Sequence, residues 1–186
     1  MSDIAIRPAE RLLDAADTLF VQQGIRAVGI DAVLRSAGVA RASLYQTYGS
    51  KDGLVAAYLR RCDERDRAAY EAARADVGDP AEEILLVFDL AAANAPRHNF
   101  RGCLYLNVAT EFPDHEHPVY AVIEAHRAWL ASVWRSALER VGVSDPEGTL
   151  AELTVIYDGG LAGSKVARST GPIESARKLA RRCLRD

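Results

Sequence analysis

The residues from Arg41 to Tyr48 carry a high density of groups that can bind DNA. The segment holds a guanidinium, two hydroxyls, an amide and two phenols. A guanidinium binds a guanine edge or a phosphate, and a Gln amide pairs with adenine. Hydroxyls and phenols donate to phosphate oxygens, which position a protein on DNA without reading its sequence. These residue types, gathered on one short segment, predict a surface that contacts DNA.

The preceding residues have the pattern needed to present such a surface. A short helix expected over 31–37 is followed by Gly38, Val39 and Ala40. Gly38 permits a sharp turn because it has no Cβ to clash with the neighbouring backbone. A short helix, a turn that contains Gly and a polar second helix over 41–47 form a helix-turn-helix. In this motif the second helix enters the major groove.

Flanking helices are expected to hold this pair in place. Apolar residues recur at three- and four-residue steps over 12–23, which predicts a first helix. Ser50 is a suitable N-cap for a fourth helix that continues to Arg74. The expected core of this three-helix head consists of Leu19, Phe20, Val33, Ala37 and Leu44. With Leu44 facing inward, the polar residues of the third helix face outward.

The rest of the chain also has helical periodicity and no alternating strand pattern. Glycine and proline breaks separate helices expected over 81–95, 102–111, 119–141, 147–169 and 173–184. The sequence therefore predicts an all-α protein of about nine helices. A domain boundary is expected near residue 55, within the fourth helix.

Composition narrows the functional classes. With 186 residues, of which 49% are hydrophobic, the chain can form a sizeable core, and its net charge of −3 restricts any DNA contact to a local patch. The three cysteines, Cys62, Cys103 and Cys183, form no CxxC pair, which favours a reducing compartment. No signal-peptide pattern or apolar run of about 18 residues is present. We therefore expect a cytoplasmic protein with no membrane partner.

The residues from 12 to 59 resemble the tetracycline-repressor (TetR) family of bacterial transcriptional regulators. The matching positions, with the family's spacing between blocks, are Ala16, Leu19, Phe20, Gly24, Ala37, Gly38, Val39, Leu44, Tyr45, Tyr48, Ser50, Lys51 and Leu54. The chain departs from the family at Gly29–Ile30, where a Thr or Ser often caps the second helix, and at Tyr48, where Phe is usual.

The resemblance implies a set of DNA-contacting residues. Phosphate contacts are implied for Tyr45, Tyr48 and Lys51, and base-facing positions for Arg41, Ala42, Ser43 and Gln46. The Thr47 hydroxyl is a further candidate for a phosphate contact. The residues of this set lie on the third helix or at the start of the fourth.

The resemblance also implies a function. Residues 1–55 are expected to form a DNA-binding domain, and residues 56–186 a ligand-binding and dimerisation domain. The protein is expected to be a homodimeric transcriptional regulator, most often a repressor, on a palindromic double-stranded DNA operator. A small apolar effector would release it. Neither enzyme activity, nor a cofactor, nor a metal ion is expected.

A candidate effector site combines one helix face with several aromatic side chains. Cys103, Asn107 and Glu111 recur at four-residue steps, so they share a face of the sixth helix. Phe88, Trp129, Trp134 and Tyr157 would supply the apolar walls that ligand sites usually have. The alternative is a core stripe with a glutamate at the surface.

A candidate dimer interface lies in the last two helices. The eighth helix contains Gly159, Gly160 and Gly163, and each central glycine costs a helix about 1 kcal/mol relative to Ala. Such clustering indicates a place where another backbone comes close. The ninth helix adds Ile173, Ala176 and Ala180, and the resemblance implies that these two helices pair with a second subunit. The alternative is a helix pair packed within one chain.

Other signals are weaker. Cys103 would sense electrophiles or oxidants if its thiolate were stabilised by Arg101 and the start of the sixth helix, which makes a redox or enzymatic protein the alternative function. A buried, inert cysteine is the simpler interpretation. The sequence His115-Glu116-His117 lacks the HExxH spacing of a zinc site, so no metal is expected there.

Overall fold

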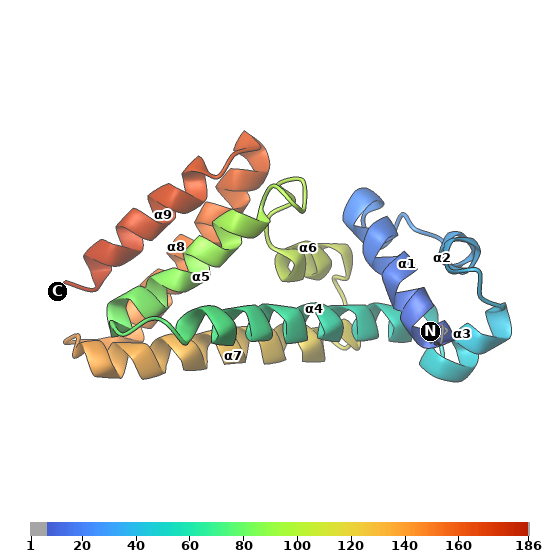
Figure 1. Ribbon diagram of the computed structural model, residues 1–186, viewed down its shortest axis with the longest axis horizontal. Coiled ribbons are helices and arrows are strands. Elements are labelled where there is room, and N and C mark those ends of the chain that lie inside the picture. Colours follow the sequence, from blue (N-terminus) through green and yellow to red (C-terminus); the bar gives the residue numbers. More distant parts are fainter. Residues whose placement is uncertain (1–6, 186) are drawn as a thin grey trace, which may run out of the picture. The chain divides into compact units, whose positions relative to one another are not determined.

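The computed structural model describes residues 7–185, and the regular structure in this range is entirely helical. Within it the helices are α1 (Pro8–Gln23), α2 (Ile30–Ala37), α3 (Arg41–Tyr48), α4 (Lys51–Arg74), α5 (Pro80–Asn94), α6 (Leu104–Glu111), α7 (Val119–Val141), α8 (Pro146–Ala167) and α9 (Gly171–Cys183) (Figure 1). The prediction of an all-α fold with about nine helices is confirmed. None of the described helices is both long enough and apolar enough to span a membrane.

The chain forms two compact units. Among the described residues, the first consists of those up to Asp63 together with Val108–Ile123, and the second consists of Glu64–Asn107 and those from Glu124 onward. The first unit thus extends beyond the boundary near residue 55 expected from the sequence, and it includes a segment from the middle of the chain. The physical reason is the start of α4, where apolar side chains are buried in the first unit's core.

The first unit is built on contacts of α1 with α2, α3 and α4. Leu44 of α3 is fully buried, as expected, although Leu19 remains partly exposed. The rings of Phe20 and Tyr58 meet edge to face, with centroids 5.3 Å apart. The Arg61 guanidinium of α4 donates to the Asp14 carboxylate of α1 over 2.6 Å. The start of α4 is therefore an integral part of this unit.

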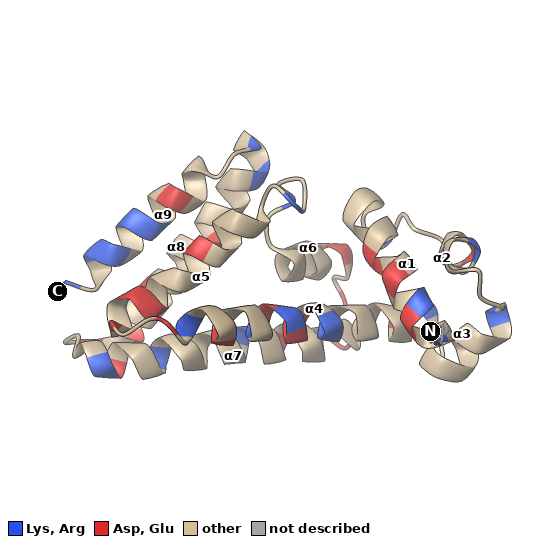
Figure 2. Ribbon diagram, in the orientation of Figure 1, with Lys and Arg blue, Asp and Glu red and all other residues tan. Residues whose placement is uncertain are grey.

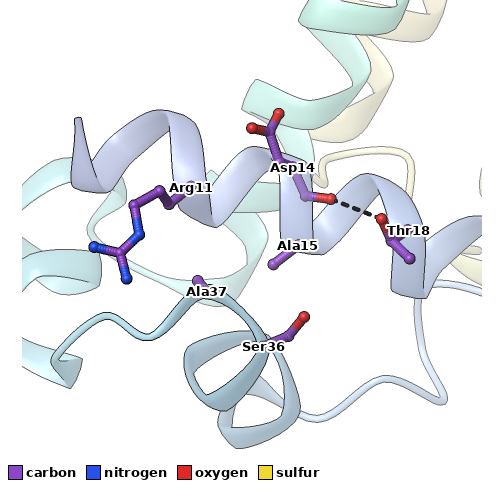
Figure 3. A pocket seen from close by; sticks show the side chains of 6 residues that line it. All are labelled: Arg11, Asp14, Ala15, Thr18, Ser36 and Ala37. Carbon is purple, nitrogen blue, oxygen red and sulfur yellow. Dashed lines mark hydrogen bonds between the residues drawn. The ribbon is translucent and has the colours of Figure 1, made fainter. Parts of the chain in front are cut away.

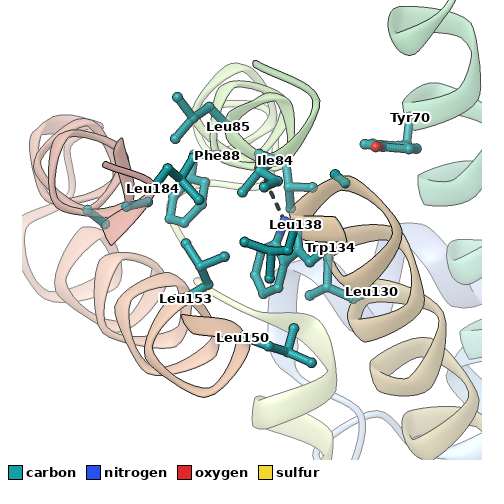
Figure 4. Close-up of a cluster of buried hydrophobic side chains, with 14 of the residues drawn as sticks. Tyr70, Ile84, Leu85, Phe88, Leu130, Trp134, Leu138, Leu150, Leu153 and Leu184 are labelled. Atoms are coloured by element: carbon teal, nitrogen blue, oxygen red, sulfur yellow. Dashed lines mark hydrogen bonds between the residues drawn. The ribbon is translucent and has the colours of Figure 1, made fainter. Parts of the chain in front are cut away.

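The second unit has its core where α5, α7, α8 and α9 meet (Figure 4). Trp134 of α7 is 0% exposed, and its indole N–H donates to the Ile84 carbonyl of α5 over 3.2 Å. Phe88 stacks on the Trp134 ring, and Leu153 approaches from α8. The indole is thus both desolvated and hydrogen-bonded, as a buried tryptophan requires.

A buried carboxylate joins α4, α5 and α7 beside this core. Arg140 donates two hydrogen bonds to the Glu83 carboxylate, over 2.8 and 2.6 Å, and Arg74 donates a third over 2.9 Å. These hydrogen bonds lower the pKa of Glu83 to about 2, although burial acts in the opposite direction. Burial, followed by the Glu83 charge, raises the pKa of the neighbouring Tyr70 to about 12.

Most of the small residues expected at a subunit interface lie between α8 and α9 of the same chain, which is the alternative stated above. A Cβ at Gly160 would come within 2.7 Å of the Ala176 Cβ, and one at Gly163 within 2.9 Å of the Pro172 Cβ. Ile173, Ala176 and Ala180 are buried. The glycines do mark a close backbone approach, but the approaching helix is α9 of the same chain. Gly159, in contrast, faces open space.

The two adjacent glycines provide a matched pair for testing this packing. We expect Gly160→Ala to lower the free energy of unfolding by about 1–3 kcal/mol, because the new methyl group overpacks the contact with Ala176. Gly159→Ala should leave it unchanged or raise it by up to about 1 kcal/mol, since alanine favours the helix. Urea unfolding followed by circular dichroism measures both. Equal effects at the two positions would contradict the assigned packing.

Candidate DNA interface and ligand-binding body

The turn between α2 and α3 is fixed by hydrogen bonds from both sides. Gly38 adopts a left-handed conformation with φ 60°, and its N–H donates to the Arg35 carbonyl. The Val39 N–H donates to the Leu34 carbonyl over 3.2 Å. From α1, the Arg11 guanidinium donates to the Gly38 carbonyl over 2.7 Å. The helix-turn-helix therefore has a defined geometry in which α3 is held against the rest of the first unit.

The start of α2 is held in place without a capping side chain. Gly29 occupies the N-cap position and makes no side-chain cap, while its carbonyl accepts from the N–H groups of Ala32 and Val33. Val28 and Val33 occupy the two positions of a hydrophobic staple, and both are buried. Buried apolar side chains on either side of the cap thus define where α2 begins.

The helix α3 carries one charged residue, Arg41, and is otherwise uncharged (Figure 2). Tyr45 is 46% exposed, whereas the adjacent Leu44 is fully buried. The other exposed residues on this helix are Arg41, Ala42, Gln46 and Thr47, and Ser43 is partly exposed. The Thr47 hydroxyl donates to the Ser43 carbonyl over 2.8 Å. The side chains expected to face bases are thus presented together on α3.

Two of the expected phosphate ligands differ in their surroundings. The Tyr48 hydroxyl donates to the Ala9 carbonyl of α1 over 2.9 Å, and burial raises the pKa of Tyr48. Its proton is therefore already used within the head, which argues against the expected phosphate contact. Lys51 lies at the start of α4, where Ser50 accepts from the Gly53 N–H over 2.9 Å. Partial burial lowers the pKa of Lys51.

The segment 108–123 contacts the head within the first unit. The Arg26 backbone N–H donates to the Glu111 carboxylate over 2.7 Å, and the Arg26 guanidinium lies 5.9 Å from the Phe112 ring centroid. His117 lies 3.4 Å from the Asp52 carboxylate at the start of α4. Glu111 was expected in the effector site. It is the last residue of α6 and lies in the first unit, where its carboxylate accepts the hydrogen bond from the Arg26 N–H.

A pocket of about 310 Å³ lies between α1 and α2 (Figure 3). Its lining consists of Arg11, Asp14, Ala15, Thr18, Ser36 and Ala37. Arg11 already binds the Gly38 carbonyl, and Asp14 already binds Arg61. A polar lining with engaged charges does not suit an apolar effector.

The expected effector residues of the second unit fall into two groups. Phe88 and Trp134 are fully buried and form part of the core, so they are not available to line a ligand site. Asn107 is also engaged, because it donates to the Arg101 carbonyl and accepts from the Lys165 ammonium, each over 2.8 Å. In contrast, Cys103, Trp129 and Tyr157 pack beside the core and keep part of their surface exposed.

An ion pair beside these residues was not foreseen from the sequence. The Arg127 guanidinium of α7 binds the Asp158 carboxylate of α8 through two hydrogen bonds of 2.8 and 2.6 Å, and both side chains are about a quarter exposed. The Asp158 charge raises the pKa of Cys103, and the Arg127 charge lowers it. Asp158 is the one charged residue in the sequence between Glu152 and Lys165. A lone charge in an otherwise uncharged helix segment indicates that it has a partner. Tyr105 adds a second polar contact, donating to Asp66 over 3.0 Å while its ring stacks on His126.

The environment of Cys103 does not favour a reactive thiolate. Burial raises the pKa of Cys103, and the backbone N–H groups of Leu106 and Tyr105 oppose this rise only in part. Gly102, with φ 73°, positions this part of the chain close to α8, since a Cβ there would lie 3.1 Å from the Leu161 carbonyl oxygen. A thiol with a raised pKa is a poor nucleophile at neutral pH.

Comparisons with known proteins agree with this architecture. A sequence model described as bacterial regulatory proteins, tetR family, matches residues 12–58, which contain the whole helix-turn-helix. A TetR-family transcriptional regulator from Streptomyces coelicolor, known from its crystal structure, is 33% identical with a TM-score of 0.88. The alignment covers 96% of this chain and 95% of that one. The chain belongs to the TetR family.

Other relatives match either part of the chain or most of its length. A helix-turn-helix transcriptional regulator of Mycobacterium tuberculosis is 37% identical over 78 residues, which cover 42% of this chain and 39% of that protein. The transcriptional repressor NemR of Escherichia coli is 24% identical over 180 residues, covering 90% of this chain and 88% of NemR. TetR-family regulators bind DNA and usually act as dimers.

Proposed function

We propose that this TetR-family regulator is a homodimeric repressor that binds a palindromic double-stranded DNA operator and is released by a small molecule. The observation that carries the proposal is the outer face of α3, where Tyr45 is 46% exposed beside the fully buried Leu44. Arg41, Ala42, Ser43, Gln46 and Thr47 share this helix. A helix that buries one side and presents polar groups on the other is suited to enter the major groove.

In this proposal Lys51 and the first N–H groups of α4 bind a phosphate next to the α3 contacts. A helix start attracts anions through its free N–H groups and its dipole. Tyr48 would act as a brace between α3 and α1, in keeping with its bond to the Ala9 carbonyl. The first compact unit, including 108–123, would be the functional DNA-binding domain.

The decisive experiment is the selection of bound sequences from random double-stranded DNA by the full-length protein. A palindromic motif whose half-sites are about 34 Å apart, one helical turn of DNA, is expected. Fluorescence anisotropy on that motif should show affinity falling steeply as salt rises, because counterions released from phosphates drive much of the binding. No enriched motif, or binding that is independent of salt, would overturn the proposed function.

A second copy of the chain is proposed to cover the outer face of α8 and α9. Val155 is 72% exposed and Val166 is 87% exposed, and with Gly159 and Ala162 they follow one stripe of α8. Leu179 of α9 is 48% exposed. An exposed apolar stripe on the helices that hold the core together marks an interaction surface. A second copy is the occupant that a palindromic operator requires.

We expect Val155→Arg to convert the dimer into a monomer, because a charge on a buried twofold contact meets its own copy. Analytical ultracentrifugation should show the change in mass, and operator affinity should fall at least about tenfold as the two heads separate. Ala128→Arg, on an exposed position of α7, is the matched control and should remain dimeric. A Val155→Arg protein that stays dimeric would place the interface elsewhere.

The effector is proposed to bind beside Cys103, Trp129 and Tyr157 in the second unit. These side chains are partly exposed next to a dense apolar core, and the Arg127–Asp158 pair supplies polar groups. Such a lining suits a small, mostly apolar molecule with a few polar atoms. The effector acts only through different affinities for the DNA-bound and released conformations. A matching compound should quench Trp fluorescence and weaken operator binding in the same concentration range.

A further inference from the structure

Asp31 and Arg41 form an ion pair across the helix-turn-helix. Asp31 lies in the first turn of α2 and Arg41 is the first residue of α3, and a guanidinium nitrogen contacts a carboxylate oxygen. The two side chains are 61% and 52% exposed, so the pair lies at the surface. Surface ion pairs contribute little to folding stability. The pair therefore adds little to the stability of the head, but it does orient the Arg41 guanidinium.

Arg41 is the only charged residue of α3. The orientation of the Arg41 side chain consequently determines where the positive charge of α3 lies. An arginine side chain has many rotamers, and a hydrogen-bonding partner restricts them before the protein binds DNA. A carboxylate near DNA, in contrast, is repelled by phosphates and weakens binding to every sequence. The Asp31 carboxylate thus lowers the affinity for DNA of any sequence, but it gives the Arg41 guanidinium a defined orientation.

We propose that Asp31 is a positioning residue that holds the Arg41 guanidinium for bidentate reading of a guanine in the major groove. The inference rests on the proposed DNA-binding function and deepens it by assigning one determinant of base specificity. Arginine contacts O6 and N7 of guanine with two parallel N–H groups, so the plane of the guanidinium must be set correctly. The Asp31 carboxylate accepts a hydrogen bond from one terminal guanidinium nitrogen, so the remaining N–H groups stay available to the base.

The test compares base preference, not affinity alone. The wild-type protein is first used to select its operator from random DNA. Dissociation constants are then measured for operators with each base at each half-site position, and for unrelated DNA of equal length. The variants are Asp31→Asn, Asp31→Glu and Arg41→Lys. Glu10→Gln is the matched control, because it also removes one negative charge from an exposed position of the head, on α1.

We expect the wild type to prefer guanine at one position of each half-site by about 5- to 150-fold. Asp31→Asn should reduce this preference several-fold at that position alone, while its binding to unrelated DNA is equal or stronger. Arg41→Lys should lose the same preference, because lysine keeps the charge but lacks the planar fork. Asp31→Glu should restore part of it. Glu10→Gln should change affinity without changing the preference profile.

Three outcomes would count against the inference. If Asp31→Asn keeps the wild-type profile at every position, Asp31 does not position Arg41. If the preference falls equally at all positions, the substitution has disturbed α2, and thermal unfolding of the same variant would show a lowered midpoint. If the wild type itself enriches no motif, the proposed function fails and the inference fails with it. An intact wild-type motif separates the first two outcomes from the third.

Discussion

Replacing Ala42 by glutamate should weaken operator binding by at least about 100-fold and leave the fold intact. Ala42 is exposed on α3, next to Arg41 and one turn before Gln46. A carboxylate there would face the phosphates across the groove, and like charges brought together at an interface cost several kcal/mol. A long side chain would also hold α3 away from the base edges. Because Ala42 is exposed, the unfolding midpoint should barely change.

The measurement is fluorescence anisotropy on the selected operator, with circular dichroism to check the fold. Ala128→Glu is the matched control, since it makes the same change on an exposed helical alanine of α7 in the second unit. The control should bind DNA within about twofold of the wild type, because Ala128 is not part of the proposed DNA-contacting helix and an exposed charge is screened by salt. Equal losses in both variants would mean that net charge, not the α3 face, controls binding.

The second large effect concerns the buried carboxylate of Glu83. We expect Glu83→Gln to lower the free energy of unfolding at pH 7 by about 2–3 kcal/mol, because the amide cannot replace three charge-assisted bonds to Arg74 and Arg140. This range allows for the partial solvent exposure of the two guanidiniums. The neighbouring core should otherwise be retained, since Gln matches Glu in volume. Urea unfolding measures the difference.

The same pair of proteins should show a specific pH dependence. The pKa of Glu83 is about 2 when folded, against an ordinary value of 4.5. Its stabilising contribution is therefore fully present above pH 4.5 and is lost as the pH falls towards 2. Wild type and Glu83→Gln should thus converge in stability over this window. Glu147→Gln, which breaks an exposed pair with Arg135, should cost less than about 1 kcal/mol. A Glu83→Gln deficit that persists at pH 2 would contradict the assignment.

The head was predictable from sequence because its determinants are local. Gly38 defines the turn, Leu44 the buried side of α3 and Ser50 the start of α4, and each acts within a few residues of its own position. The start of α2 was harder, since Gly29 offers no capping side chain and the staple of Val28 and Val33 uses ordinary apolar residues. The Asp31–Arg41 pair spans the turn, so it depends on a geometry that only the folded motif supplies.

The second unit was less predictable, because each of its sequence patterns is compatible with two different arrangements. A glycine such as Gly160 signals close approach of a backbone, but a helix of the same chain and a helix of another subunit need the same small residue. Phe88 and Trp134 have the aromatic character of a ligand wall, and equally that of a core. The Arg127–Asp158 pair joins α7 and α8, so no local spacing announces it. Only the three-dimensional arrangement distinguishes these alternatives.

The inclusion of segment 108–123 in the first unit has a consequence for how the protein is made. A ribosome completes α1, α2 and α3 long before it adds Glu111, whose carboxylate binds the Arg26 backbone 85 positions earlier. Closing so long a loop is entropically costly and slows folding. During synthesis, the backbone N–H of Arg26 therefore lacks its Glu111 partner until the ribosome has made α6. Translation speed across residues 64–107 would set how long that vulnerable interval lasts.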